Sequence, residues 1–104
     1  MVLAGKVLNG SLPKDEREKA ADALIESKEK RAVRPMIDAM YRDDDAIARE
    51  LGNRVFKGIT GKDAGYRHDL PKDARVKIMP RVWDVWYGLK DQIDREDAKK
   101  AKEK

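Results

Sequence analysis

The stretch GITGKDAGYRHDLP, residues 58–71, gathers the residue types that could do chemistry. It holds three glycines, a lysine, two carboxylates and His68, the only histidine among the 104 residues. Such a set could form a phosphate-binding loop, an acid/base or metal site, or a turn between helices. The spacing of the residues favours the turn.

The glycine spacing does not match a phosphate-binding loop. That loop needs G-x-x-x-x-G-K-[ST] between a strand and a helix, so that backbone N–H groups surround the phosphate and the hydroxyl binds magnesium. Here G-x-x-G-K-D follows a predicted helix, and the carboxylate of Asp63 would repel phosphate. Gly61 and Gly65 are instead predicted to end the helix with left-handed backbone conformations.

The sequence offers few side chains that could act in acid/base catalysis or bind a metal. His68 has no second histidine to join it and the chain has no cysteine, whereas a catalytic metal recruits several protein ligands. The acidic run at residues 43–45 lacks the alternating ligands and central glycine of a calcium loop, so a turn with a helix N-cap explains it better. The sequence therefore predicts no catalytic residue, no metal ligand and no cofactor.

Composition bounds the class of the protein and its location. Lys and Arg number 24, and Asp and Glu number 20, for a net charge of +4. The charge is thus mixed, and a nucleic-acid partner is allowed but not indicated. No apolar run approaches the roughly 20 residues that span a membrane, and the opening MVLAGKVLNG lacks the features of a signal peptide. We expect a cytoplasmic protein with no membrane partner.

The elements that position these residues are predicted to be helices. Apolar periodicity predicts helices over residues 13–27, 31–41 and 45–59, and no stretch alternates for long enough to form a strand. A last helical region begins near residue 71, with an apolar seam at intervals of 3, 4, 3 and 4: Met79, Val82, Trp86, Leu89 and Ile93. Pro80 is predicted either to kink this region or to start a new helix, with a break near residues 78–80, because proline lacks the N–H that a helix needs.

An internal echo relates two of the predicted helices. Residues 17–24 and 49–56 share the frame R-E-x-small-x-x-apolar-apolar at an offset of 32 residues. The small residues of this frame, Ala20 and Gly52, would let a neighbouring helix approach closely.

The residues around the echo resemble a HEAT-like repeat of the short bacterial type. Residues 30–61 show a first helix with Pro35, an acidic turn at residues 43–45 and a second helix that opens near Arg49. The resemblance implies that a turn aspartate, Asp44 or Asp45, interacts with Arg49 within and between repeats.

The continuation is similar to an ending found in some bacterial HEAT-repeat proteins, where a glycine-containing turn leads through a proline to a closing helix with paired tryptophans. The matching residues are Thr60, Gly61, Asp63, Gly65, Tyr66, Pro71, Trp83 and Trp86. The resemblance implies an all-α fold, a short α-solenoid of antiparallel helix hairpins with about four to five helices and a C-terminal capping helix. Residues 1–97 would form one domain, composed of a repeat remnant (1–27), a full repeat (30–60), a turn (61–71) and a capping helical region (72–97), and a frayed charged tail would follow (98–104).

The resemblance further implies a non-catalytic protein-interaction or scaffold module, which could be part of a larger protein. The residues expected to bind a protein partner are Arg17, Arg49, Arg54 and Trp83. For Trp83 two interpretations stay open: it packs against the glycine-rich turn, or it is a partly exposed anchor for a partner. The alternative function is a nucleic-acid-binding helical domain with a basic surface made of Arg67, Lys72, Arg75, Lys77 and Arg81.

Overall fold

The computed structural model describes residues 2–103, and the side chains of residues 3–100. This part of the chain is helical and contains no strand. Its elements are α1 (Val2–Leu8), α2 (Lys14–Ser27), the 3₁₀ turn η1 (Lys30–Ala32), α3 (Val33–Met40), α4 (Ala46–Thr60) and α5 (Lys72–Glu103). The all-α prediction is confirmed.

Local signals set the ends of the helices. Asp45 caps α4 because its side chain accepts a hydrogen bond from the Ala48 N–H at 3.0 Å, as the acidic turn predicts. Gly61 ends the same helix with φ of 70°, a left-handed conformation that glycine adopts without strain. The predicted helix over residues 31–41 begins as η1 and continues as α3, which ends at Met40.

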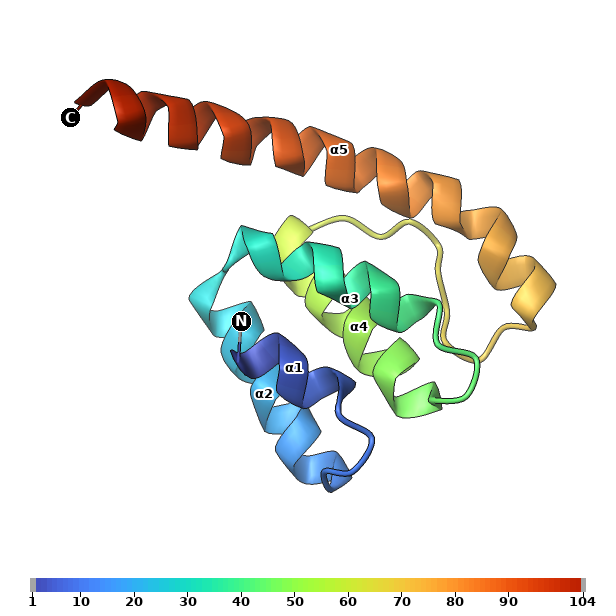
Figure 1. Cartoon of the computed structure of the whole chain (residues 1–104). Coiled ribbons are helices and arrows are strands. Elements are labelled where there is room, and N and C mark those ends of the chain that lie inside the picture. Colours follow the sequence, from blue (N-terminus) through green and yellow to red (C-terminus); the bar gives the residue numbers. More distant parts are fainter. Residues whose placement is uncertain (1, 104) are drawn as a thin grey trace.

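The first four helices form two hairpins that pack side by side (Figure 1). α1 packs on α2, α3 packs on α4, and the hairpins meet mainly through α2 and α4. Glycines permit the close contacts of α4. A Cβ added to Gly52 would lie 2.7 Å from the Met36 carbonyl oxygen on α3, and one added to Gly58 would lie 2.8 Å from Ile25 on α2.

Two buried clusters hold these elements together. The cluster between the two hairpins, here called the alanine-rich core, draws on α1, α2, η1, α3 and α4 and consists of Ala4, Val7, Ala20, Ala21, Leu24, Ala32, Met36, Leu51 and Val55. The cluster beneath α5, here called the aromatic core, consists of Val33, Ile37, Met40, Phe56, Tyr66, Met79, Val82, Trp86, Leu89 and Ile93. The predicted seam of α5 therefore faces the interior along its whole length.

The prediction for Pro80 holds in part: no new helix starts there, because α5 runs as one continuous ribbon through Pro80, but the axis of α5 bends in its yellow-orange first part, where the proline lies (Figure 1). Proline removes one backbone hydrogen bond, the one that the Val76 carbonyl would accept. Val76 is exposed, so water can satisfy that carbonyl. Met79 and Val82 are buried on either side of Pro80, and their packing holds the helix together across the proline.

The C-terminal part of α5 extends past the two hairpins (Figure 1). Two ion pairs connect it to η1: Lys30 with Glu96 at 2.8 Å, and Arg31 with Asp97. Residues 98–103, predicted as a frayed tail, belong to α5 in the structure, and residue 104 lies outside the described residues.

Candidate partner-binding surface

The glycine-rich stretch forms a reversal between α4 and α5. Gly61 and Gly65 both have positive φ, 70° and 86°, as predicted for residues that end a helix and shape a turn. The carboxylate of Asp63 accepts a hydrogen bond from the Gly65 N–H at 2.8 Å, so it stabilises the loop. The turn interpretation of this stretch is confirmed.

The residues after this turn attach the loop to the helical hairpins. Tyr66 is buried, and its hydroxyl donates to the Met40 carbonyl at 2.7 Å. Asn53 on α4 donates to the Tyr66 carbonyl, and Arg49 donates to the His68 carbonyl at 3.1 Å. Asn53 and Arg49 lie one turn apart, on a different side of α4 from Gly58. The loop therefore covers a side of α4 away from α2.

Arg17, predicted to bind a partner, is buried. Only 2% of its surface is exposed, and it donates to the Val7 carbonyl at 2.9 Å and to the Asp45 carboxylate at 2.7 Å. These bonds connect α1, α2 and the start of α4. The charge of Arg17 is thus paired inside the protein, and Asp45 pairs with Arg17 rather than with Arg49. A partner-binding role for Arg17 stays a prediction, which its burial does not favour.

The other two predicted arginines of the second helices also have partners within the chain. Arg49 donates to the carbonyls of Arg42, Asp43 and His68, so it closes the turn before α4. Arg54 is 40% exposed and pairs with Glu50 and Asp22. Arg49 and Arg54 are both partly buried, and their roles in partner binding stay predictions.

The basic residues of the alternative nucleic-acid surface differ in whether they form ion pairs within the chain. Three form ion pairs: Arg67 with Asp69, and both Lys72 and Arg75 with Asp43. The hydrogen bond from Lys72, together with Arg75, holds the pKa of the Asp43 carboxyl below its usual range despite the opposing effect of desolvation. Lys77 and Arg81 form no ion pair within the described residues. The nucleic-acid alternative stays a prediction, with two unpaired cations to support it.

Trp83 lies in a group of aromatic side chains at the surface. Its ring centroid is 6.4 Å from that of Tyr41 and 6.2 Å from that of Tyr87. The guanidinium carbon of Arg34 lies 4.8 Å from the centre of the Trp83 ring, a cation–π contact. We call Arg34, Tyr41, Trp83 and Tyr87 the aromatic cluster. The partners of Trp83 thus come from α3 and its C-cap and from α5, whereas the sequence suggested the glycine-rich turn.

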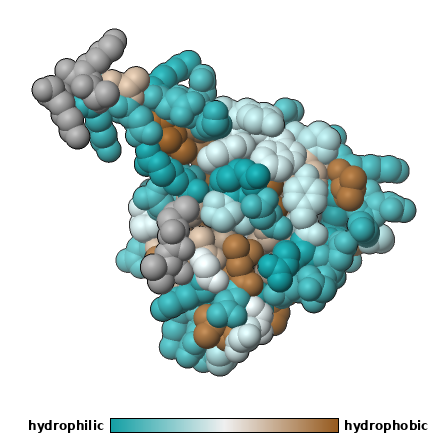
Figure 2. Space-filling view, viewed as in Figure 1, coloured by the Kyte–Doolittle hydropathy of each residue, from teal (hydrophilic) through white to brown (hydrophobic). Residues whose placement is uncertain are grey.

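The aromatic cluster is accessible to a partner. Tyr41 and Tyr87 are 42% and 61% exposed, and Trp83 is half-buried between them. Figure 2 shows a band of pale side chains, of intermediate hydropathy, where α5 passes over α3. Val76, on the same face of α5 and seven residues before Trp83, extends the exposed apolar surface. The interpretation of Trp83 as a partly exposed anchor therefore agrees with its surroundings.

Hydrogen bonding fixes the cluster and leaves donors at its edge. The Trp83 indole N–H donates to the Tyr41 hydroxyl oxygen at 2.7 Å. Because the phenol oxygen acts as acceptor in that bond, its own proton remains available to another group. The Tyr87 hydroxyl likewise donates to no described residue. The cluster can thus offer both flat apolar surface and hydrogen-bond donors.

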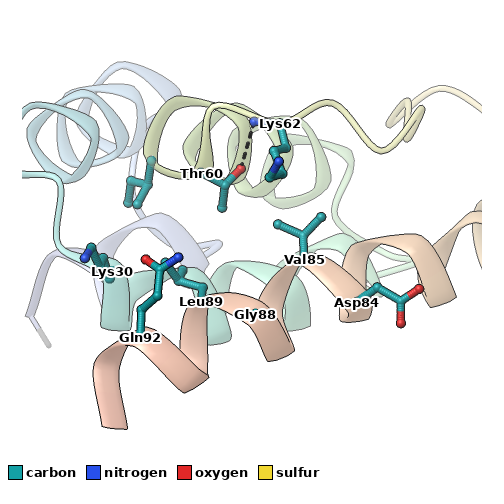
Figure 3. Close-up of a pocket in the computed structure, with 9 residues that line it drawn as sticks. Lys30, Thr60, Lys62, Asp84, Val85, Gly88, Leu89 and Gln92 are labelled. Atoms are coloured by element: carbon teal, nitrogen blue, oxygen red, sulfur yellow. Dashed lines mark hydrogen bonds between the residues drawn. The ribbon is translucent and has the colours of Figure 1, made fainter. Parts of the chain in front are cut away.

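A groove of about 460 Å³ lies between the end of α4 and the middle of α5 (Figure 3). Its lining combines apolar and charged side chains: Lys30, Ile59, Thr60, Lys62, Asp84, Val85, Gly88, Leu89 and Gln92. The Thr60 hydroxyl is engaged, because it donates to the Phe56 carbonyl and accepts from the Lys62 N–H. Among the described residues, no three His, Asp or Glu side chains converge to hold a metal ion.

Of the aromatic cluster, only Trp83 was predicted from the sequence as a site residue, and the other three members were missed. Tyr87 follows Trp83 at the helical spacing of four residues, so its neighbourhood to Trp83 could be read from the sequence. Tyr41 lies 42 residues before Trp83 in the chain, and neither it nor Arg34 shows a local signal. Only the packing of α5 against α3 brings these residues together.

Two further observations complete the description. No described helix is both long enough and apolar enough to cross a membrane. Nor do comparisons with known proteins assign the chain to a group: no protein-family model matches it, and neither a curated protein nor a solved structure is significantly similar to it.

Proposed function

We propose that the chain is a non-catalytic protein-interaction module of HEAT-like type that binds a partner protein through the aromatic cluster. The observation that carries this proposal is the exposure of Tyr41 and Tyr87 on both sides of Trp83. Tryptophan, tyrosine and arginine are the residues most enriched among the energetic hot spots of interfaces. All three residue types meet in this cluster.

The cluster is organised before a partner arrives. The Trp83 side chain is fixed by the hydrogen bond to Tyr41 and by the guanidinium of Arg34, and Arg34 is itself held by an ion pair with Asp38. A flexible side chain that becomes ordered on binding costs about 0.5–1.5 kcal/mol in lost rotamer freedom. Side chains that are already ordered avoid most of this cost. A fixed aromatic cluster therefore favours binding.

Three features support the HEAT-like part of the proposal. Two hairpins lie side by side through their second helices, as in a short α-solenoid. Arg17 and Arg49 occupy equivalent positions in the 32-residue echo. Each donates to a backbone carbonyl that precedes its own helix: Arg17 to that of Val7, before α2, and Arg49 to that of Arg42, before α4. Asp45 connects the hairpins through Arg17. In this scheme α5 is the capping helix, and the aromatic cluster lies partly on its outer face.

The proposal can be tested with a matched pair of variants on α5. Tyr87→Ala removes the most exposed ring of the cluster, whereas Lys77→Ala removes an exposed side chain of the same helix outside it. Proteins captured from the source cells by the native chain are identified, and the purified partner is titrated with each variant. We expect Tyr87→Ala to weaken binding by about 30-fold, the equivalent of a 2 kcal/mol hot spot, and Lys77→Ala to bind like the native chain. Equal affinity of all three proteins would refute the proposed surface.

A further inference from the structure

The hydrogen-bonding state of the aromatic cluster narrows the kind of partner that fits it. The Tyr41 hydroxyl accepts the Trp83 indole N–H at 2.7 Å, so its own O–H proton is free to bind a further acceptor. The Tyr87 hydroxyl, on a side chain that is 61% exposed, also has no acceptor among the described residues. A partner at this surface therefore gains most if it presents free carbonyl oxygens.

The ring geometry adds a second requirement. Tyr41, Trp83 and Tyr87 form a row, with 6.4 Å and 6.2 Å between successive ring centroids and interplanar angles of 35° and 29°. Where they are exposed, these neighbouring rings present faces and edges to the solvent. Compact, rigid apolar groups of a partner can pack against such exposed ring surfaces.

A polyproline II segment meets both requirements. Its backbone makes no internal hydrogen bonds, so every carbonyl is free to accept, and proline rings are compact, rigid, apolar and without an N–H that needs an acceptor. An α-helix satisfies its own interior carbonyls, and a β-strand needs a sheet edge to pair with, which residues 2–103 do not provide. Proline-rich segments are also stiff before binding and therefore lose little conformational entropy.

We propose that the aromatic cluster recognises a proline-rich segment of the partner in the polyproline II conformation, with prolines against the Tyr41, Trp83 and Tyr87 rings and partner carbonyls on the two tyrosine hydroxyls. This inference rests on the proposed function and specifies the partner. Arg34 covers a face of Trp83 at 4.8 Å and pairs with Asp38, so it acts as a positioning residue for the tryptophan. The segment then contacts the outer edge of the row.

The test uses a synthetic decaproline peptide and the full chain. Binding is followed by the ¹H–¹⁵N signal of the Trp83 indole, with the indole signal of the buried Trp86 as internal reference. We expect saturable binding with a dissociation constant of about 1 mM or tighter, and shifts at Trp83 that exceed those at Trp86. A ten-residue Gly-Ser peptide, flexible and without rings, is expected to leave both signals unchanged.

Variants separate the rings from the hydroxyls. Tyr87→Ala removes ring and hydroxyl, and we expect at least about tenfold weaker decaproline binding. Tyr87→Phe keeps the ring and removes one donor, which corresponds to a loss of about two- to tenfold. Lys77→Ala should bind decaproline like the native chain. Thermal unfolding of each variant, followed by circular dichroism, verifies that the exposed substitutions leave the fold intact.

The outcomes distinguish this inference from the proposed function. If decaproline gives no shift at Trp83, or if the Gly-Ser peptide binds equally well, the polyproline inference is overturned. The interaction function nevertheless stands if the captured protein partner depends on Tyr87. Conversely, a captured partner that binds Tyr87→Ala unchanged overturns the proposed function, even where decaproline binds the native chain.

Discussion

The two buried cores are built from side chains of different size. The alanine-rich core joins the two hairpins, and four of its nine members are alanines. The aromatic core joins the second hairpin to the loop and to α5, and it includes Phe56, Tyr66 and Trp86. Small side chains let helices lie close together, whereas large ones fill the wider space beneath a single covering helix. The two hairpins are thus held to each other by close contact of small side chains, whereas α5 is held to the second hairpin by large ones.

The largest expected effect comes from removal of volume from the aromatic core. Trp86→Ala removes a side chain that is 9% exposed and lies on the inward seam of α5. We expect the free energy of unfolding to fall by about 3–5 kcal/mol, measured by urea denaturation. The half-buried Trp83 serves as the control: Trp83→Ala is expected to cost less. If Trp86→Ala changes the free energy by under about 1 kcal/mol, the seam does not hold α5.

A second variant tests how the hairpins are joined beside the alanine-rich core. Asp45→Ala leaves the buried Arg17 guanidinium without its charged partner and also removes the cap of α4. Loss of one partner of a buried ion pair costs about 3–5 kcal/mol, and we expect the lower end because Asp45 is 12% exposed. The neighbouring Asp44 is 81% exposed, so Asp44→Ala should change stability by no more than about 0.5 kcal/mol. Equal effects of the two variants would contradict the assigned pair.

A third comparison uses two helical glycines. Gly52→Ala places a Cβ 2.7 Å from the Met36 carbonyl oxygen, so α3 and α4 must move apart, whereas a Cβ at Gly88 has no atom within 4 Å. We expect Gly52→Ala to lower the melting temperature through an overpacking cost of about 1–3 kcal/mol. Gly88→Ala should raise it, because alanine favours the helix over glycine by about 0.5–1 kcal/mol. A stabilised Gly52→Ala variant would show that the hairpin does not need close contact there.

The smallest expected effect concerns pH. Burial alone would raise the pKa of Asp45, but the hydrogen bonds from Arg17 and from the Ala48 N–H outweigh it, so the pKa lies below the usual value. A carboxyl whose pKa is lower in the folded state stabilises the fold at pH above its unfolded pKa, about 3.9, and this stabilisation is lost as the pH falls through the folded pKa. Native protein should therefore lose stability between pH 5 and pH 2 more steeply than Asp45→Asn, as measured by urea denaturation at each pH. Parallel curves would contradict the assignment.

The sequence predicted the features that depend on local spacing. The seam from Met79 to Ile93, the cap at Asp45 and the reversal at Gly61 and Gly65 follow from helical periodicity and from the backbone preferences of single residues. The same local rules predicted that Pro80 would kink the last helix or start a new one; α5 stays continuous, because packing on both sides of the proline outweighs the loss of one hydrogen bond. Local rules are therefore reliable here until tertiary packing opposes them.

The candidate site depended on contacts that spacing does not reveal. Arg17 has the same local pattern as a solvated arginine, but its partner Asp45 lies 28 residues away. Tyr41 and Trp83 are likewise brought together only when α5 packs over α3. Of the residues expected to contact a partner, only Trp83 belongs to the aromatic cluster. It could be named from the sequence because tryptophan is itself a typical interface anchor.

The long separation in sequence between α5 and its partners has a kinetic consequence. The hairpins join helices that follow one another in the chain, whereas the ion pairs that connect α5 to η1 span 66 residues. Contacts between distant residues form more slowly than local ones, because the intervening chain must first be ordered. We therefore expect α5 to dock last during folding. The row of Tyr41, Trp83 and Tyr87 then exists only in the completed molecule, so a partner that binds this row distinguishes finished chains from partly folded ones.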